Sequence, residues 1–93
     1  MQIIWSLDAE KDLKKVYQFC LKQDTNYANK IILEIIESPK SVLFENQYQE
    51  DEFLGLPYRR FFVKHWRIVY KTKNNSLIIL RVFDTRKNPK KLK

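Results

Sequence analysis

Residues 58–84 have the sequence YRRFFVKHWRIVYKTKNNSLIILRVFD, which contains three apolar runs separated by short polar turns. The runs are rich in β-branched and aromatic residues, so we predict strands over 58–64, 67–73 and 77–84. His65-Trp66 and Asn74-Asn75-Ser76 lie between them at the spacing of hairpin turns. Alternation along the strands places Arg67, Val69 and Lys71 on one face, and it places Leu77, Ile79, Arg81 and Phe83 together. The last run is apolar on nearly both faces, which favours a central strand.

Upstream of this meander, the apolar residues recur at the helical period. Ser6 is placed to cap a first helix, whose apolar stripe is Leu13, Val16, Tyr17, Cys20 and Leu21. Thr25 is the candidate cap of a second helix, whose stripe is Ala28, Ile31, Ile32, Ile35 and Ile36. Pro39 ends that helix, because the residue before a proline avoids the α region. About four polar residues join the two helices, which is typical of an antiparallel hairpin.

These elements predict an α+β fold in a single domain over residues 1–93. A short strand at Gln2–Trp5 precedes the helical hairpin, and the three-stranded antiparallel meander follows. The simplest packing lays both helices on one face of a twisted antiparallel sheet, with the first strand added beside one of the later three. The other sheet face would then be open and basic, with Arg67 exposed on the polar side of the middle strand.

The charge is divided unevenly along the chain. Residues 58–93 hold 12 Lys and Arg against one acid, a balance of +11. Residues 1–57 hold 6 basic and 10 acidic residues, a balance of −4, so the net +7 describes neither half. The acids are densest in the irregular segment 40–57, which Gly55 and Pro57 close with turn chemistry. A cationic sheet attracts an anionic partner, which can be RNA, DNA or an acidic protein segment.

Several common site types are excluded by composition. One Gly cannot supply a phosphate loop, and one His with one Cys supplies neither a metal cluster nor a nucleophile–base pair. We therefore expect no metal and no cofactor, and Cys20 reads as a buried, inert thiol. Residues 1–5 are too short for a secretory leader, and no apolar run approaches the length of a bilayer span. We expect a cytoplasmic protein that does not contact a membrane.

The remaining candidate site is a set of cations interleaved with aromatic rings. Basic groups hold phosphates and rings stack on unpaired bases, so the set could bind a nucleic acid or another target. The alternative is that these side chains only protect and solubilise a half-exposed sheet. His65 could shuttle a proton in RNA cleavage, or it could be an ordinary turn residue. The candidate target-binding residues are Arg59, Arg60, Lys64, Arg67, Arg81, Arg86 and Lys87.

In this order and at this length, the motifs resemble the RelE/ParE family of bacterial type II toxins. Trp5-Ser6 followed by Ala9 and Asp12-Leu13 resembles the opening strand and first helix of that family. Tyr58-Arg59-Arg60 with Trp66–Tyr70 resembles its core hairpin, and Leu77–Phe83 its final strand. Asp84–Pro89, with the sequence DTRKNP, resembles the ending of the ParE-like branch. The likeness implies a microbial ribonuclease-like fold and a growth-inhibiting toxin, neutralised by a cognate antitoxin that is acidic and folds on binding.

The family divides by target. RelE-like members are metal-independent mRNA endoribonucleases that act on the ribosome, and the likeness would give this chain a catalytic set of Arg67, Arg86, Arg59 and His65. Such members usually carry a Tyr or His near the C-terminus for proton transfer, whereas nothing after Phe83 is Tyr or His. ParE-like members instead poison DNA gyrase. That absence and the Asp84–Pro89 ending favour the ParE-like branch, and whether the chain is an enzyme stays open.

Overall fold

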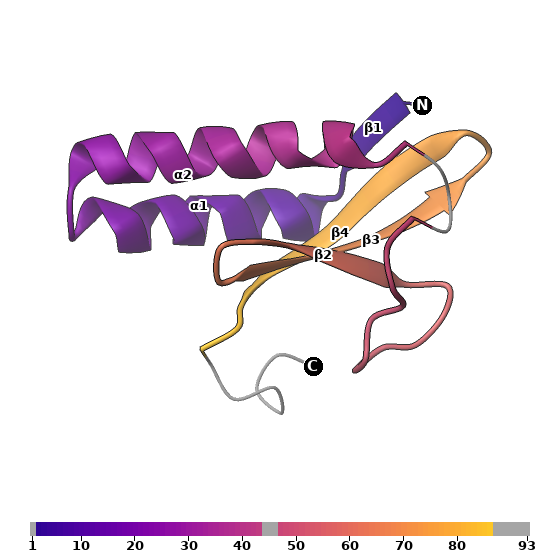
Figure 1. Cartoon of the computed structure of the whole chain (residues 1–93). Helices are drawn as coiled ribbons and strands as arrows, with labels where there is room; N and C mark the ends of the chain where they lie inside the picture. Colours follow the sequence, from indigo (N-terminus) through magenta and orange to yellow (C-terminus); the bar gives the residue numbers. More distant parts are fainter. Residues whose placement is uncertain (1, 44–46, 87–93) are drawn as a thin grey trace.

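The computed structural model describes residues 2–43 and 47–86. Within these ranges four strands form one sheet in the order β1-β4-β3-β2 (Figure 1). Their bounds are Gln2–Trp5 for β1, Arg59–Val63 for β2, Trp66–Lys73 for β3 and Ser76–Asp84 for β4. The predicted meander is therefore confirmed, and its last strand lies inside the sheet. Lys87 and the 88–93 tail lie outside the described residues.

The sheet is mixed, and the prediction of a purely antiparallel sheet was wrong. β2 and β3 pair antiparallel, as do β3 and β4, but β1 runs parallel to β4 with Ile3 beside Leu77. A four-residue apolar strand carries no signal for the direction of its pairing, which is set when the chain crosses through the helices. The backbone N–H of Ser6 donates to the carbonyl of Ile79 at 2.9 Å, so the pairing continues to the start of the first helix.

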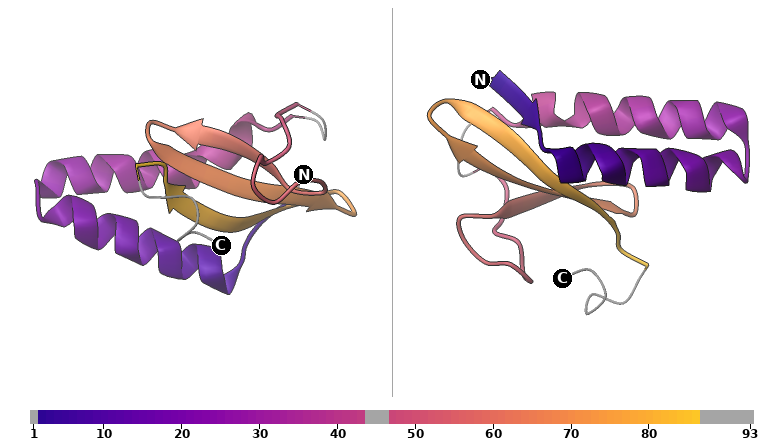
Figure 2. Two further views of the ribbon diagram at one scale, coloured as in Figure 1. Left: turned by 90° about the horizontal axis from the view of Figure 1, so that it is seen from below. Right: turned by 180° about the vertical axis from the view of Figure 1, so that it is seen from behind.

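The two helices cover one face of the sheet, as predicted (Figure 2). They span Leu7–Leu21 (α1) and Thr25–Glu37 (α2), and a 3-10 turn over Ser38–Ser41 follows. Ser6 caps α1 by accepting a hydrogen bond from the N–H of Ala9 at 3.0 Å. The cap of α2 is Asp24 and not Thr25, because the carboxylate of Asp24 accepts from the N–H of Tyr27. No helix in the described ranges is long and apolar enough to cross a membrane.

The core lies between the helices and the inner face of the sheet. Ala28, Ile31 and Ile35 of α2 are fully buried there, and Ile68 and Ile79 lie in the same cluster. A register shift at Val69/Tyr70 pairs Val69 with Arg81 but Tyr70 with Ile79, so Leu80 has no partner on β3. Such a bulge reverses the alternation of the strand that contains it. The prediction that Leu77 and Ile79 share a face with Arg81 and Phe83 was therefore wrong.

Candidate target-binding face

The sheet face opposite the helices carries three of the predicted arginines, and we call it the arginine face. The strand registers arrange it as two neighbouring rows. One row runs Arg60–Val69–Arg81 across β2, β3 and β4, and the next runs Phe62–Arg67–Phe83. Arginine thus alternates with phenylalanine in the second row, whereas the first row has Val69 between its two arginines; a surface of this kind can bind through charge and ring stacking together.

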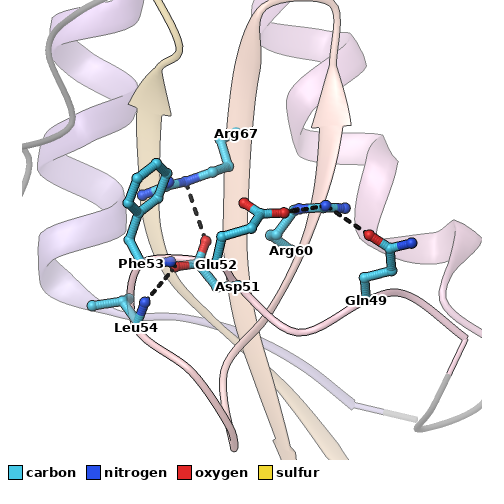
Figure 3. Close-up of polar contacts among 7 residues, drawn as sticks. All are labelled: Gln49, Asp51, Glu52, Phe53, Leu54, Arg60 and Arg67. Carbon is cyan, nitrogen blue, oxygen red and sulfur yellow. Dashed lines mark hydrogen bonds and ion pairs between the residues drawn. The ribbon is translucent and has the colours of Figure 1, made fainter.

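A segment of the chain lies on this face, which we call the acidic cover (residues 49–54, QEDEFL) (Figure 3). Asp51 is fully buried and lies 3.3 Å from Nε of Arg67. Glu52 accepts from Nε of Arg60 at 2.8 Å, and the amide oxygen of Gln49 accepts from Nη2 of Arg60 at 2.9 Å. The prediction of an open face with Arg67 exposed was therefore wrong, since only 4% of Arg67 is accessible.

The cover is held by its own backbone and by Asp51. The second carboxylate oxygen of Asp51 accepts from the N–H groups of Phe53 and Leu54 at 3.2 and 2.9 Å. The N–H of Gly55 donates to the Asp51 carbonyl, and the N–H of Asp51 donates to Tyr58, each at 2.8 Å. Gly55 has a φ of +73°, which L side chains rarely adopt. One buried carboxylate therefore both folds the segment and anchors it to the sheet.

Arg67 lies between two aromatic rings. Its guanidinium carbon is 4.6 Å from the ring centroid of Phe53 and 4.7 Å from that of Phe83. Burial lowers the pKa of Arg67, while the nearby Asp51 and Glu52 carboxylates raise it. An arginine nonetheless stays charged at neutral pH, so the pair is a cation and an anion in a largely dry site. The Nε of Arg67 and the facing oxygen of Asp51 make no hydrogen bond among the described atoms, so the contact is an ion pair without good hydrogen-bond geometry.

Arg81, at the other end of its row, reaches α1. Its guanidinium donates to the two carboxylate oxygens of Asp12 at 2.8 and 3.2 Å. Asp12 also accepts from the backbone N–H of Val82 at 2.8 Å. β1 ends beside Ile79, so Asp12 takes the place of a strand partner where the edge of β4 would otherwise be open. The bond from Asp12 raises the pKa of Arg81.

The other predicted cations do not join this face. Arg59 is the register partner of Tyr70 on β3, so its side chain points to the helix side of the sheet. Its Nη1 donates a hydrogen bond to the carbonyl of Tyr48. The ammonium of Lys64 lies 5.7 Å from the ring centroid of Tyr27 on α2. Every predicted cation in the described part of the chain therefore has a contact within the protein.

Arg86 and His65 lie together at the far end of the sheet, on the helix side. The side chain of Arg86 donates to both oxygens of Asp84 and lies 5.4 Å from the ring centroid of Phe19 on α1. Burial lowers the pKa of His65, and the charge of Arg86 lowers it further. Burial alone would raise the pKa of Asp84, but bonds from Arg86 hold it below its usual value. The four residues predicted for a nuclease are thus split: His65 and Arg86 lie at the same end of the sheet, whereas Arg67 lies on the arginine face.

An open groove of 730 Å³ runs between α2 and β2. Glu34 and Glu37 line it from α2, and Phe62 and Lys64 line it from the β2 side. β2 is an edge strand. One of its sides pairs with β3 along its whole length, and near its start the outer side pairs with the cover through a Glu50–Arg59 bridge and a bond from the N–H of Arg60 to the carbonyl of Gln49. In the described ranges, 2–43 and 47–86, no group of three or more His, Cys, Asp or Glu is arranged to hold a metal.

The sequence analysis missed the carboxylates that face these arginines. Asp12 lies one turn from Val16 and in line with Ala9 and Cys20, so a carboxylate inside an apolar stripe was the available signal for a buried ion pair. The signal for Asp51 was weaker: an acidic segment directly precedes a basic strand. Neither pattern identifies which arginine each acid meets, because those contacts join residues far apart in the chain.

Comparison with solved structures finds the same fold in several other proteins. The chromosomal ParDE toxin–antitoxin system of P. aeruginosa contains a chain that superposes with a TM-score of 0.77, at 20% identity over 90% of this chain and 95% of that one. A conserved hypothetical protein of Helicobacter pylori gives 0.62, at 23% identity over 94% and 97%. The E. coli DinJ-YafQ complex gives 0.53, at 17% identity over 91% and 93%. At these identities the likeness establishes the RelE/ParE toxin fold.

The sequence identifies the family within that class. The profile described as the ParE toxin of the type II toxin-antitoxin system, parDE, matches residues 3–89. The chain therefore belongs to the ParE toxin family of type II toxin–antitoxin systems, as the sequence motifs indicated. No curated protein sequence matches it significantly.

Proposed function

We propose that this toxin arrests growth in the cytoplasm by binding DNA gyrase, as ParE-like toxins do, and that it does not cleave RNA. The observation that carries the proposal is the state of Arg67. This arginine is 4% exposed and is already paired with a buried carboxylate. A group that stabilises a scissile phosphate must reach it and must not be neutralised beforehand.

Three further observations support the same target. Arg67 and Arg86 lie on opposite sides of the sheet, so they do not converge on one phosphate. No Tyr or His follows Phe83 to move a proton. The family profile that matches the chain also names the ParE branch.

The proposed regulatory partner is a cognate antitoxin with an acidic segment. Structural neighbours of this chain come from toxin–antitoxin complexes, including the P. aeruginosa ParDE system and DinJ-YafQ. The net charge of +7 favours an acidic partner. The groove between α2 and the edge strand β2 is a surface that an ordering segment can fill.

The two targets are separated by induction of the toxin in bacterial cells. If gyrase is the target, cells that produce the toxin induce the DNA-damage response. In a separate assay, toxin added to purified gyrase and supercoiled plasmid causes trapped cleavage complexes to accumulate. With mRNA as the target, primer extension after brief induction detects codon-linked cuts.

The matched control for the cell experiment is a variant that lacks the fold, Ile35→Asp. We expect the wild-type toxin to give trapped gyrase complexes without mRNA cuts, and we expect no trapped complexes with Ile35→Asp. Early mRNA cuts with no trapped gyrase would overturn the proposal and favour the RelE-like alternative, a ribosome-dependent endoribonuclease.

A further inference from the structure

One turn of the chain leaves three large apolar side chains in contact with solvent. They are Phe53, Leu54 and Leu56, and we call this group the apolar turn. Within residues 2–43 and 47–86, no other run of four residues exposes more than two such side chains. Single exposed apolar residues are normal on a protein surface, whereas several together mark a site of contact. The apolar turn therefore has the composition of an interaction surface.

The backbone of the apolar turn is fixed by hydrogen bonds within the chain. A carboxylate oxygen of the buried Asp51 accepts from the N–H groups of Phe53 and Leu54 at 3.2 and 2.9 Å. The N–H of Gly55 donates to the Asp51 carbonyl at 2.8 Å, and the N–H of Tyr58 donates to the Gly55 carbonyl at 3.0 Å. Because the turn is ordered in the free protein, a partner that binds it loses little free energy in ordering it.

The charges beside the apolar turn are negative, although the whole chain carries +7. Glu50 and Glu52 are both exposed there. Charges of opposite sign meet across protein interfaces, and like charges oppose contact. The surface that fits the turn is therefore an apolar pocket with a basic rim. An acidic antitoxin segment does not match it, and two copies of a chain of this net charge repel each other.

We propose that the apolar turn docks on DNA gyrase, with Leu54 and Leu56 in an apolar pocket that has a basic rim. The inference rests on the proposed function, since it takes gyrase as the target. An enzyme that holds DNA carries basic surface for the phosphates, and such a surface supplies the rim that Glu50 and Glu52 require. The ion pair of Asp51 with Arg67 then serves the docking, because it fixes the turn on the sheet.

The test compares variants that are matched for exposure. Leu56→Ser in the turn is matched by Leu33→Ser on α2, since these side chains are 62% and 61% exposed. Leu54→Ser is matched by Ile36→Ser, at 42% and 41%. Binding to immobilised gyrase holoenzyme is measured by biolayer interferometry. We expect Leu54→Ser with Leu56→Ser to weaken binding at least about tenfold, and the double control on α2 to stay within about twofold of the wild type.

The outcomes separate this inference from the proposed function. A wild-type toxin that does not bind gyrase would refute the proposed function and the inference with it. Binding that the double variant retains would refute the inference alone, because another surface of the toxin would then hold gyrase. If the double variant melts more than about 4 °C below the wild type, the single variant Leu56→Ser decides, with an expected loss of at least about threefold.

Charge reversal beside the turn tests the chemistry of the rim. Glu50→Lys should weaken binding to gyrase about threefold at low salt, because a lysine then faces a basic surface. Glu10→Lys, at the start of α1, makes the same change in net charge and should have a smaller effect. Equal or tighter binding by Glu50→Lys than by the wild type would overturn the assignment of a basic rim.

Two further measurements test the occupant directly. Peptides that contain residues 53–56 should exchange their amide hydrogens more slowly in the complex with gyrase, and unchanged exchange would place the contact elsewhere and refute the inference. Sedimentation velocity of the toxin alone should detect a monomer. A wild-type dimer that the double variant abolishes would assign the turn to a second copy of the chain and would overturn the proposal.

Discussion

Removing the carboxylate of Asp51 should be among the most damaging single changes outside the apolar core. Asp51→Ala leaves Arg67 as a charge that is 4% exposed and has lost its facing anion. Breaking a buried pair in this way costs about 3–5 kcal/mol. The expected stability of a 93-residue domain is about 5–14 kcal/mol, so the loss ranges from about a fifth of it to all of it. The midpoint of thermal unfolding should fall by at least about 12 °C.

The assay is a double-mutant cycle that combines Asp51→Ala with Arg67→Met. The free energy of unfolding of each variant is measured by urea titration, with the fluorescence of the buried Trp66 as the signal. Methionine keeps a long apolar side chain between the rings of Phe53 and Phe83, and it removes the charge. Arg67→Met alone leaves Asp51 fully buried without a cation, so it should also be strongly destabilised. The double variant removes both charges and should be about as stable as either single variant, with a coupling energy of at least about 2 kcal/mol.

The neighbouring Glu52 provides the control. The Glu52 side chain is half exposed, so its pair with Arg60 is partly solvated and Glu52→Ala should cost about 1 kcal/mol. A loss below about 1 kcal/mol for Asp51→Ala, or additive effects of the two buried changes, would refute the view that Asp51 anchors the cover through Arg67.

Three further changes test other parts of the structure. Asp12→Ala should lower the free energy of urea unfolding by about 2–4 kcal/mol, because Arg81 and the N–H of Val82 lose a charged acceptor. The control Asp8→Ala, in the first turn of α1, should cost about 1 kcal/mol or less. Equal losses for the two variants would contradict the role of Asp12. Ile35→Asp should abolish the near-ultraviolet circular dichroism of the folded chain, since it buries an unpaired charge at a fully buried site, and Leu33→Asp, at a position 61% exposed, should not; a folded Ile35→Asp would refute the placement of the core. Because the pKa of Asp84 is lowered in the folded state, its carboxylate stabilises the fold above its unfolded pKa, and this contribution is lost as the pH falls below about 4. The Asp84→Asn variant should therefore be less stable than the wild type at pH 7 and should lose less stability on acidification. Parallel curves of melting temperature against pH for the two proteins would contradict this.

The local elements could be predicted because their causes are local. The alternation in residues 58–84 and the helical period before Pro39 are properties of short windows, and the caps and turns add chemistry within a few residues. Asn74 and Asn75 have φ values of 51° and 61°, which suits a two-residue hairpin turn, one residue shorter than the predicted Asn74-Asn75-Ser76 connection because β4 begins at Ser76. The order of the motifs also indicated the toxin family.

The candidate site could be predicted only as a set of residue types. The arginines were identified, but the face of Arg81 depends on the bulge at Leu80, which no alternation pattern contains. The direction of β1 depends on the path of the chain through two helices. A strand pattern therefore states which residues alternate, and it does not state where the alternation reverses.

By itself, the sequence determined that this chain forms a helical hairpin and a basic meander of the toxin class. Only the tertiary structure decided that Arg67 is buried against Asp51 and that Arg86 lies on the other side of the sheet. The physical reason is the range of the forces: propensity and periodicity act between near neighbours, whereas an ion pair forms between residues that folding brings together. The sequence states which side chains carry a charge, but whether such a charge is free to bind a partner depends on which residues the fold places beside it.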